Sequence, residues 1–211
     1  MTIFSHQKPK QRFTQSWLLL GLLLWLTLLQ NADAKNFSTV VIDAGHGGSD
    51  KGSNWYGVHE KKLTLDLAKR VQRILKSKGV RTVMTRSTDT YVALDKRAQI
   101  ANRQKHFIFV SIHFNGHKNT SYKGIETFYY PGSSKGKKLA TKIQYELGKR
   151  IKTKNRGIKS ARLKVLRLTR GPAALVECGF LSNRWENNRC NASWLREIIA
   201  EEIVQGIMAY R

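Results

Sequence analysis

The sequence predicts an α/β fold, a single domain in which helices flank both faces of a twisted, mostly parallel sheet. Short β-branched runs alternate along the chain with longer segments whose apolar residues recur at helical spacing. The runs at 107–112 and 173–176 are almost wholly apolar, which is typical of strands that are covered on both faces. No internal repeat or long linker interrupts this alternation, so we expect no second domain.

The first half of the chain supplies two strands and two helices. Residues 39–42 (TVVI) form a β-branched run that ends in a Gly-rich loop, and 80–84 forms a second such run. Apolar residues recur at helical spacing over 63–75, and this helix is closed by Gly79. The same spacing predicts a helix over 94–101.

The second half continues the alternation. The segments expected are a strand at 107–112, a strand at 125–130, a helix at 139–151, a strand at 173–176 and a helix at 195–207. The strand at 125–130 is stopped by Pro131 and Gly132. Because parallel strands need crossover connections, these intervening helices indicate a largely parallel sheet.

Residues 1–34 have the pattern of a secretory signal peptide. Three basic residues precede the apolar run 17–29, and Ala32-Asp33-Ala34 follows as a cleavage signature. The run of 13 residues is shorter than the roughly 20 that span a bilayer as a helix. We expect export to the periplasm or cell wall as residues 35–211. The alternative is a leader that is retained as a membrane anchor.

The charge balance points to an anionic partner. The chain has 38 Lys and Arg against 14 Asp and Glu, a net charge of +24 that becomes +22 without the leader. Such an excess suits nucleic acid, a membrane surface or an anionic polymer, and export disfavours nucleic acid. A hydrophobic content of 41% excludes a disordered polycation. Two cysteines exclude a disulfide scaffold and a Cys-rich zinc domain.

Candidate functional residues follow the predicted strands. His46 comes after the first strand, His113 ends the run at 107–112, and Glu177 ends the run at 173–176. Glu60 lies in the loop before the first helix. Functional groups gather at such strand ends in open α/β sheets. Two imidazoles, one carboxylate and an open position describe a catalytic zinc site, and Glu177 would transfer the proton of the bound water.

Each of these residues also has an ordinary structural interpretation. A single histidine at a strand end is more often hydrogen-bonded than metal-bound, and Glu60 beside Lys61 would serve as a surface ion pair. Glu177 is harder to explain in this way, because a carboxylate that ends an apolar strand is costly to bury without a partner. It is the joint occurrence of the four residues that favours a metal site.

Six motifs together resemble a known family. They are IDAGHGGSDKG at 42–52, HEK at 59–61, TR at 85–86, SIHFN at 111–115, KGIETFYY at 123–130 and ALVECGFLSN at 174–183. In this order and spacing they resemble the zinc-dependent N-acetylmuramoyl-L-alanine amidases of the amidase-3 type. The resemblance covers nearly all of residues 35–211, which would then be the catalytic domain.

The resemblance implies a complete activity. His46, Glu60 and His113 would be the ligands of Zn²⁺, and Glu177 the catalytic glutamate. The family cleaves the amide that joins N-acetylmuramic acid to L-alanine of the peptide stem, so the partner would be peptidoglycan. Glu177 would act as general base toward water and then as general acid toward the alanine nitrogen. We expect a monomer.

Several further positions could support this reaction, and their roles are hypotheses. Asn115 and the backbone amides of Gly47 and Gly48 would orient the substrate. Asp43 would either hold the second ring nitrogen of His46, as carboxylates near metal ligands often do, or cap a turn.

Some members of the family carry a long helical insertion that blocks the zinc site until a partner removes it. Here only PGSSKG at 131–136 separates the strand from the next helix. We therefore expect an open cleft that needs no activator, and no appended wall-binding domain.

Four other residues and one segment leave alternatives open. His117 and His59 have spacing that would allow metal binding, but we expect both at the surface. Cys178 and Cys190 either pair in an oxidising compartment or stay as free thiols, and strand alternation turns Cys178 away from the site. Residues 149–170 contain ten bases and no acid, which is either a solvated face or a surface that holds the enzyme on an anionic envelope polymer.

Overall fold

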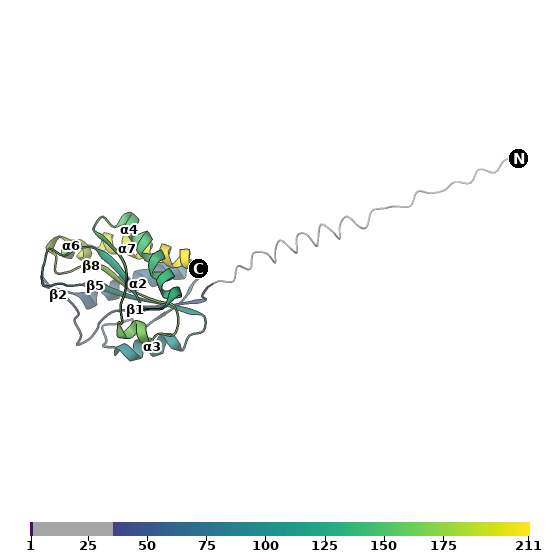
Figure 1. Cartoon of the computed structure of the whole chain (residues 1–211), viewed down its shortest axis with the longest axis horizontal. Coiled ribbons are helices and arrows are strands. Elements are labelled where there is room, and N and C mark those ends of the chain that lie inside the picture. The colour runs from purple at the N-terminus through teal and green to yellow at the C-terminus, as the bar shows by residue number, and fades with distance from the viewer. Residues whose placement is uncertain (2–35) are drawn as a thin grey trace. The chain divides into compact units, whose positions relative to one another are not determined.

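The computed structural model describes Met1 and residues 36–211, so the predicted signal peptide lies outside the described residues apart from Met1. A six-stranded sheet forms the centre, in the order β4-β1-β5-β8-β6-β7 (Figure 1). Its strands are β1 (Thr39–Ala44), β4 (Arg81–Met84), β5 (Phe107–Asn115), β6 (Ile125–Tyr129), β7 (Asn155–Ser160) and β8 (Ala173–Phe180). Within residues 36–211, the helices are too short or too polar to cross a membrane.

The sheet is mostly parallel, as predicted. Strands β4, β1, β5 and β8 all run in the same direction, whereas β6 pairs antiparallel with β8 and parallel with β7. The reversal at β6 follows from its connection, because the chain returns from β5 through the loop 116–124 without a crossover helix. The register of β5 and β8 sets His113 opposite Glu177.

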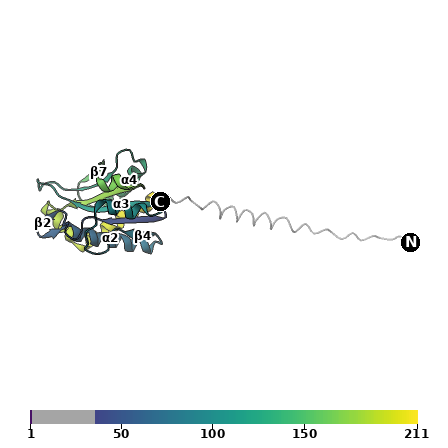
Figure 2. The same ribbon diagram turned by 90° about the horizontal axis from the view of Figure 1, so that it is seen from below.

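Helices cover both faces of the sheet, which confirms the predicted class. One face carries α2 (Glu60–Ser77) and α4 (Ser134–Arg150), and α7 (Ser193–Tyr210) packs against both helices. The other face carries α3 (Leu94–Asn102) and α5 (Lys164–Leu168). Figure 1 places α4 and α7 on the side opposite α3, and Figure 2 looks onto the face with α3.

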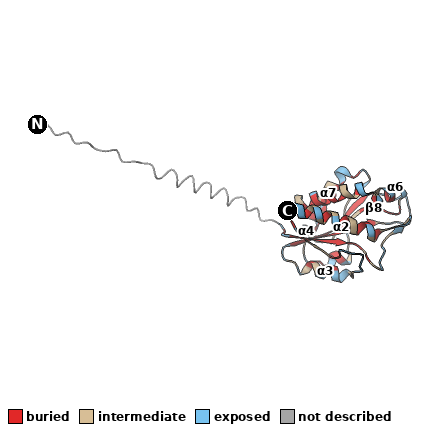
Figure 3. Cartoon of the chain, turned by 180° about the vertical axis from the view of Figure 1, so that it is seen from behind, coloured by how far each residue is buried: buried red, intermediate tan, exposed pale blue. Residues whose placement is uncertain are grey.

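The first strand shows why the apolar runs do not alternate with polar residues. Val40 and Ile42 enter the large cluster beneath α2 and α4, whereas Val41 enters the smaller cluster with Phe109 and Leu175. Both faces of β1 are therefore buried, and every residue of the strand is inaccessible (Figure 3). A strand in this position needs apolar side chains on both faces.

Several short elements escape prediction from the sequence. They are the hairpin strands β2 (Asn54–Trp55) and β3 (Val58–His59), the edge strand β7, helix α5 and helix α6 (Arg184–Asn191). Strand β7 reads NRGIKS and helix α6 reads RWENNRCN, so neither has an apolar period. Helix α6 is instead defined at its start, where the Asn183 side chain accepts a hydrogen bond from the Glu186 amide.

The contact between α4 and α7 depends on Gly206. A Cβ atom at this position would lie 2.4 Å from Ile143 Cα on the facing helix, a distance that backbone atoms cannot relieve without moving apart. Alanine normally stabilises a helix relative to glycine by about 1 kcal/mol. We predict that Gly206→Ala does the opposite and lowers the free energy of unfolding by about 1–3 kcal/mol. Urea denaturation measures it.

The neighbouring exposed residue supplies the control. Gln205→Ala changes the same turn of α7 without entering the helix contact, so its effect should stay within about 0.5 kcal/mol. Stabilisation by Gly206→Ala would show that the two helices pack less closely than described.

Candidate metal centre

The sheet brings the four predicted site residues to one edge. His46 follows β1, His113 lies near the end of β5, and Glu177 lies in β8. Glu60 is the first residue of α2, which begins earlier than its apolar period suggests. The site therefore lies beyond the carboxyl ends of parallel strands, where open α/β sheets place their ligands.

Three of these residues form a compact ligand cluster. Glu60 Oε1 lies 3.0 Å from His46 Nε2 and 3.0 Å from His113 Nδ1. One ligand atom from each residue falls within 4.8 Å of the others. Two imidazole nitrogens and a carboxylate oxygen are the donor set that zinc takes in catalytic sites. The residues present therefore fit a bound zinc ion.

The Glu60 carboxylate is held firmly although it is almost inaccessible. Its side chain is 3% exposed, and it accepts hydrogen bonds from the Phe114 amide at 3.0 Å and the Ser53 amide at 2.8 Å. Burial raises the pKa of Glu60, but the hydrogen bonds with His113 and His46 outweigh burial and hold the pKa far below its ordinary value. Glu60 is therefore ionised at neutral pH, which is the state that a carboxylate needs to bind a metal ion.

Two glycines make room for the cluster. A Cβ atom at Gly45 would lie 2.4 Å from the His113 ring. A Cβ atom at Gly52 would lie 2.6 Å from both Glu60 Oε2 and His46 Cδ2. Only glycine allows the backbone to come this close to the ligand side chains.

The carboxylate that supports His46 is Asp50, and the prediction that Asp43 does so is wrong. His46 adopts a left-handed backbone conformation with φ 59°, and its Nδ1 lies 2.8 Å from Asp50 Oδ2. Asp50 Oδ1 accepts a hydrogen bond from the Gly52 amide at 3.0 Å. The segment HGGSD at 46–50 could have indicated this contact, because a turn through the two glycines brings Asp50 back to His46.

Asp43 lies inside the protein and faces other partners. It accepts hydrogen bonds from Thr85 Oγ1 at 2.6 Å, Ser111 Oγ at 2.6 Å and Arg97 Nη1 at 2.8 Å. Burial raises the pKa of Asp43, but the Arg97 charge and these hydrogen bonds outweigh burial and lower the pKa below its ordinary value. The alternative role as a turn cap is also wrong, because Asp43 is a residue of β1.

Two buried arginines fix the loop that carries His46. Arg97 donates to the carbonyls of Ala44 at 2.6 Å and His46 at 2.7 Å. Arg86 donates to the same Ala44 carbonyl at 2.9 Å and to the Gly45 carbonyl at 2.8 Å. Arg86 belongs to the TR motif at 85–86. Nothing in the sequence marked Arg97 as a functional residue, apart from its being a basic residue among the apolar residues of the predicted helix. These contacts hold the loop in its unusual conformation.

Glu177 stands beside the cluster without a partner of its own. Its Oε2 atom is buried and has no hydrogen-bond partner among the described residues. Burial and the negative charges of Glu60 and Glu126 raise the pKa of Glu177 well above its ordinary value. Glu126 lies opposite Glu177 on β6. A carboxyl group with a raised pKa is suited to take up and release a proton near neutral pH.

The groups predicted to orient the substrate, which are the Gly47 and Gly48 amides and the Asn115 side chain, form hydrogen bonds within the protein. The Gly47 amide donates to the Asp50 carbonyl, and the Gly48 amide donates to Asp89 Oδ1. That part of the prediction is wrong, because both donors already have partners. Asn115 donates to Glu126 Oε1 at 2.9 Å, so it positions a carboxylate beside Glu177.

The remaining candidates lie outside the ligand cluster, which contains His46, Glu60 and His113 only. His59 lies in the short strand β3. The exposed ring of His117 stacks on Tyr122, with 3.9 Å between ring centroids. Cys178 and Cys190 are both buried, and both thiols are free.

A hollow of about 240 Å³ opens beside the two histidines. Tyr91, Val92 and Leu94 form an apolar side of this hollow, and Tyr91 is 59% exposed. The site is thus reached from solvent across a wall suited to the apolar parts of a ligand.

Comparison with known proteins identifies the family. The sequence model of the Amidase_3 family, described as N-acetylmuramoyl-L-alanine amidase, matches residues 40–209. The chain belongs to this amidase family. The resemblance seen in the six motifs is thereby confirmed.

Individual amidases are similar over most of the described chain. LytC of Bacillus subtilis (strain 168) is 34% identical over 175 residues, which cover 82% of this chain but 35% of LytC. An N-acetylmuramoyl-L-alanine amidase from Clostridium difficile 630 has a TM-score of 0.80 and 39% identity over 83% of this chain and 97% of its own. The CwlD amidase of Clostridioides difficile, solved with the GerS lipoprotein, has a TM-score of 0.79 and 31% identity over 82% and 98% of the two chains.

The buried ion pair between Asp43 and Arg97 yields a prediction. Arg97→Met leaves the Asp43 charge uncompensated in the interior, so we expect a loss of about 3–5 kcal/mol in the free energy of unfolding at pH 7. The double variant Asp43→Asn/Arg97→Met carries no buried charge there and should lose less than Arg97→Met alone. Additive losses in this urea-denaturation cycle would show that the two residues act independently.

The pH dependence of stability provides a second test of the pair formed by Asp43 and Arg97. A carboxyl group with a lowered folded-state pKa stabilises the protein above its unfolded pKa of about 3.9, and this contribution disappears as pH falls through the folded-state pKa. The difference in stability between wild type and Asp43→Asn should therefore be full at pH 7 and shrink below about pH 4. An unchanged difference at low pH contradicts the assignment.

Proposed function

We propose that the chain is a zinc-dependent peptidoglycan hydrolase that cleaves the amide between N-acetylmuramic acid and L-alanine of the stem peptide. The observation that carries this proposal is the buried Glu60 carboxylate held between two imidazoles, with the unpartnered Glu177 carboxyl beside it. Membership of the amidase family supports the choice of substrate and bond.

His46, Glu60 and His113 would hold the zinc ion. When bound there, zinc polarises the scissile carbonyl and lowers the pKa of its water. Neighbouring groups hold two of these three residues: Asp50 orients the His46 ring, and two backbone amides fix the Glu60 carboxylate. Such prior organisation supports both metal affinity and catalysis.

Glu177 would carry the proton in both halves of the reaction. Its carboxylate accepts a proton from the attacking water as the new carbon–oxygen bond forms. Its carboxyl group then gives a proton to the alanine nitrogen as the carbon–nitrogen bond breaks. The raised pKa of Glu177 suits this exchange, because the carboxyl must be able to exist in both states at the working pH.

The place of action would be outside the cytoplasm. We propose that residues 1–34 are a cleaved signal peptide, as their charge and apolar pattern indicates. Relatives described as probable cell wall amidases, such as LytH of Staphylococcus aureus, support a wall substrate. An uncleaved leader would instead anchor the enzyme to the membrane.

The basic segment 149–170 would contribute to attraction by anionic envelope polymers. Part of its charge is used within the fold: Lys149 pairs with Glu146, Arg150 with Glu201, and Lys159 with Glu126. Seven of its bases have no ion pair within residues 36–211, namely Lys152, Lys154, Arg156, Arg162, Lys164, Arg167 and Arg170. Attraction from such exposed charges weakens as salt rises.

Digestion of purified peptidoglycan tests the reaction itself. We expect intact stem peptides with free L-alanine amino ends, seen by mass spectrometry, from the purified chain without an added protein factor. The connection between β6 and α4 is short, since β6 ends at Tyr129 and α4 begins at Ser134, which supports the expectation of an open cleft and of activity without a factor. Products cut only in glycan strands or peptide cross-links would refute the proposed bond, and strict need for a factor would refute the open cleft.

Glu177→Gln tests the proton carrier. We expect activity to fall by about 10²–10⁴-fold, because an amide cannot exchange the proton, while zinc content measured by metal analysis stays at the wild-type level. Glu201→Gln, an exposed carboxylate on α7, is the matched control and should keep wild-type activity. Retained lysis by Glu177→Gln would remove Glu177 from the mechanism.

A pair of histidine variants tests the metal ligands. His113→Ala should lose zinc and activity together, because a ligand is missing from the cluster. His59→Ala should keep both, although His59 is adjacent to Glu60 in the sequence. A chelator should abolish wild-type activity and added zinc should restore it. Loss of zinc in His59→Ala with retention in His113→Ala would reverse the assignment.

A further inference from the structure

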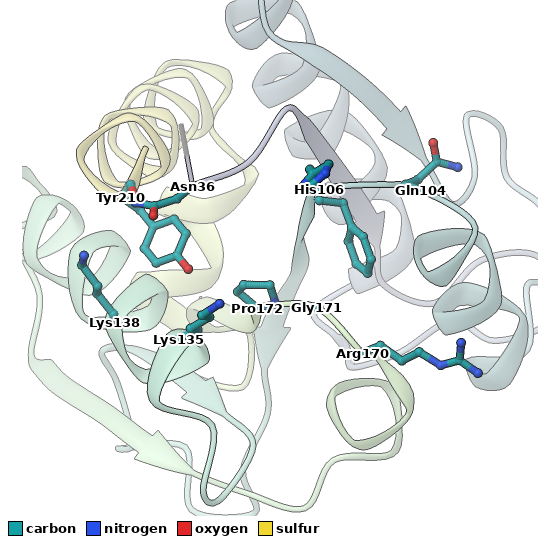
Figure 4. A pocket seen from close by; sticks show the side chains of 10 residues that line it. Asn36, Gln104, His106, Lys135, Lys138, Arg170, Gly171, Pro172 and Tyr210 are labelled. Atoms are coloured by element: carbon teal, nitrogen blue, oxygen red, sulfur yellow. Dashed lines mark hydrogen bonds between the residues drawn. The ribbon is translucent and has the colours of Figure 1, made fainter. Parts of the chain in front are cut away.

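A second hollow lies at the edge of the sheet opposite the metal centre. It has a volume of about 390 Å³ and is formed where β5 and β8 begin, with Phe107 and Pro172 at these strand starts (Figure 4). The metal ligands lie where β1 and β5 end. The hollow is therefore separate from the catalytic cleft, and its size is within the range of ligand pockets.

Cationic side chains from separate segments surround the hollow. Lys135 and Lys138 come from the first turns of α4, Arg170 from the turn before β8 and His106 from the loop before β5. No Asp or Glu is among the described residues that line it. Within residues 36–211, the two lysines and Arg170 form no ion pair. Their charge is available to an external anion.

The side chains are placed for an extended ligand. Figure 4 shows the Lys135 ammonium and the Tyr210 hydroxyl directed into the hollow, whereas Lys138 and Arg170 lie along two different sides of it. Lys138 Nζ is 5.8 Å from the centre of the Tyr210 ring. Positive charge on both sides favours an anion that passes across the hollow over a single small ion within it.

The backbone at the rim is strained. His106 has a left-handed conformation with φ 46°, and its carbonyl accepts hydrogen bonds from the amides of Ser38 and Thr39. Non-glycine residues in this conformation cost about 1–3 kcal/mol and are concentrated at functional sites. The bonds from the start of β1 maintain His106 at the rim of the hollow.

We propose that this hollow binds phosphate groups of an anionic phosphodiester polymer of the cell envelope. Lys135, Lys138 and Arg170 carry three positive charges at neutral pH, and a single carboxylate would neutralise only one of them. Successive phosphate groups along a polymer would match positive charges that are spread over two sides of the hollow. Lysine binds phosphate as a point charge, and the arginine guanidinium binds it through two parallel hydrogen bonds. Because the hollow and the metal centre lie at opposite edges, a bound polymer would leave the catalytic cleft open. This inference does not require the proposed amidase activity.

Binding of purified poly(glycerol phosphate) by the folded chain tests the proposal. At about 0.1 M salt, we expect Lys135→Glu/Arg170→Glu to weaken binding by about tenfold or more, since two attractive charges become repulsive at the site. Lys69→Glu/Lys76→Glu makes the same change in net charge at exposed positions of α2, outside the basic segment 149–170, and should weaken binding by no more than about threefold. Inorganic phosphate should displace the polymer more strongly than chloride at equal ionic strength.

Several outcomes would overturn the proposal. Equal weakening by the two double variants would mean that the polymer responds to net charge and not to the hollow. Absence of polymer binding by the wild type would refute it directly. Binding to phosphatidylglycerol vesicles, but not to the polymer, through Lys135 and Arg170 would identify a membrane surface as the partner. Both variants should digest soluble peptidoglycan fragments as the wild type does, so failure of the amidase assay would be recognised separately.

Discussion

The buried ion pair between Asp43 and Arg97 is the interaction on which the metal centre depends. Both side chains are 2% exposed, and a buried charge without a partner costs several kcal/mol. The pair joins β1 to α3, and Ser111 and Thr85 add bonds from β5 and from the segment after β4. The same Arg97 side chain reaches the His46 carbonyl. One satisfied ion pair thus connects the sheet, a helix and the loop that presents His46, a candidate metal ligand.

The convergence of the candidate site residues could be predicted because its signal is chemical and local. His46, His113 and Glu177 each interrupt or end an apolar strand, where a polar side chain needs a functional or structural reason. Parallel strands with buried faces also have a strong apolar signature, so the order of strands and helices followed from the same patterns. These two kinds of information together were enough to predict that the four site residues lie close together at the carboxyl ends of the strands.

Other parts of the structure depend on contacts that leave little trace in a sequence. Asp43 and Asp50 flank the same glycine-rich loop, and only the turn geometry decides that Asp50 supports His46 while Asp43 faces Arg97. Strand β7 is polar and lies at the edge of the sheet, so its pairing with β6 rather than its composition makes it a strand. The antiparallel direction of β6 likewise depends on the length of the loop that precedes it, and a loop has no apolar period in the sequence.

Three carboxyl groups converge on the catalytic edge, and their partners assign their roles. Glu60 lies between two imidazoles, and Glu126 is paired with Lys159 and accepts a hydrogen bond from Asn115. Glu177 is partly buried, and its inaccessible Oε2 atom has no hydrogen-bond partner among the described residues. Its ionised form is opposed both by burial and by the two neighbouring charges. Environments that separate the pKa values of neighbouring carboxyls divide the chemistry between them. The raised pKa of Glu177 beside Glu60 and Glu126 therefore supports the proposal that Glu177 is the group that exchanges the proton.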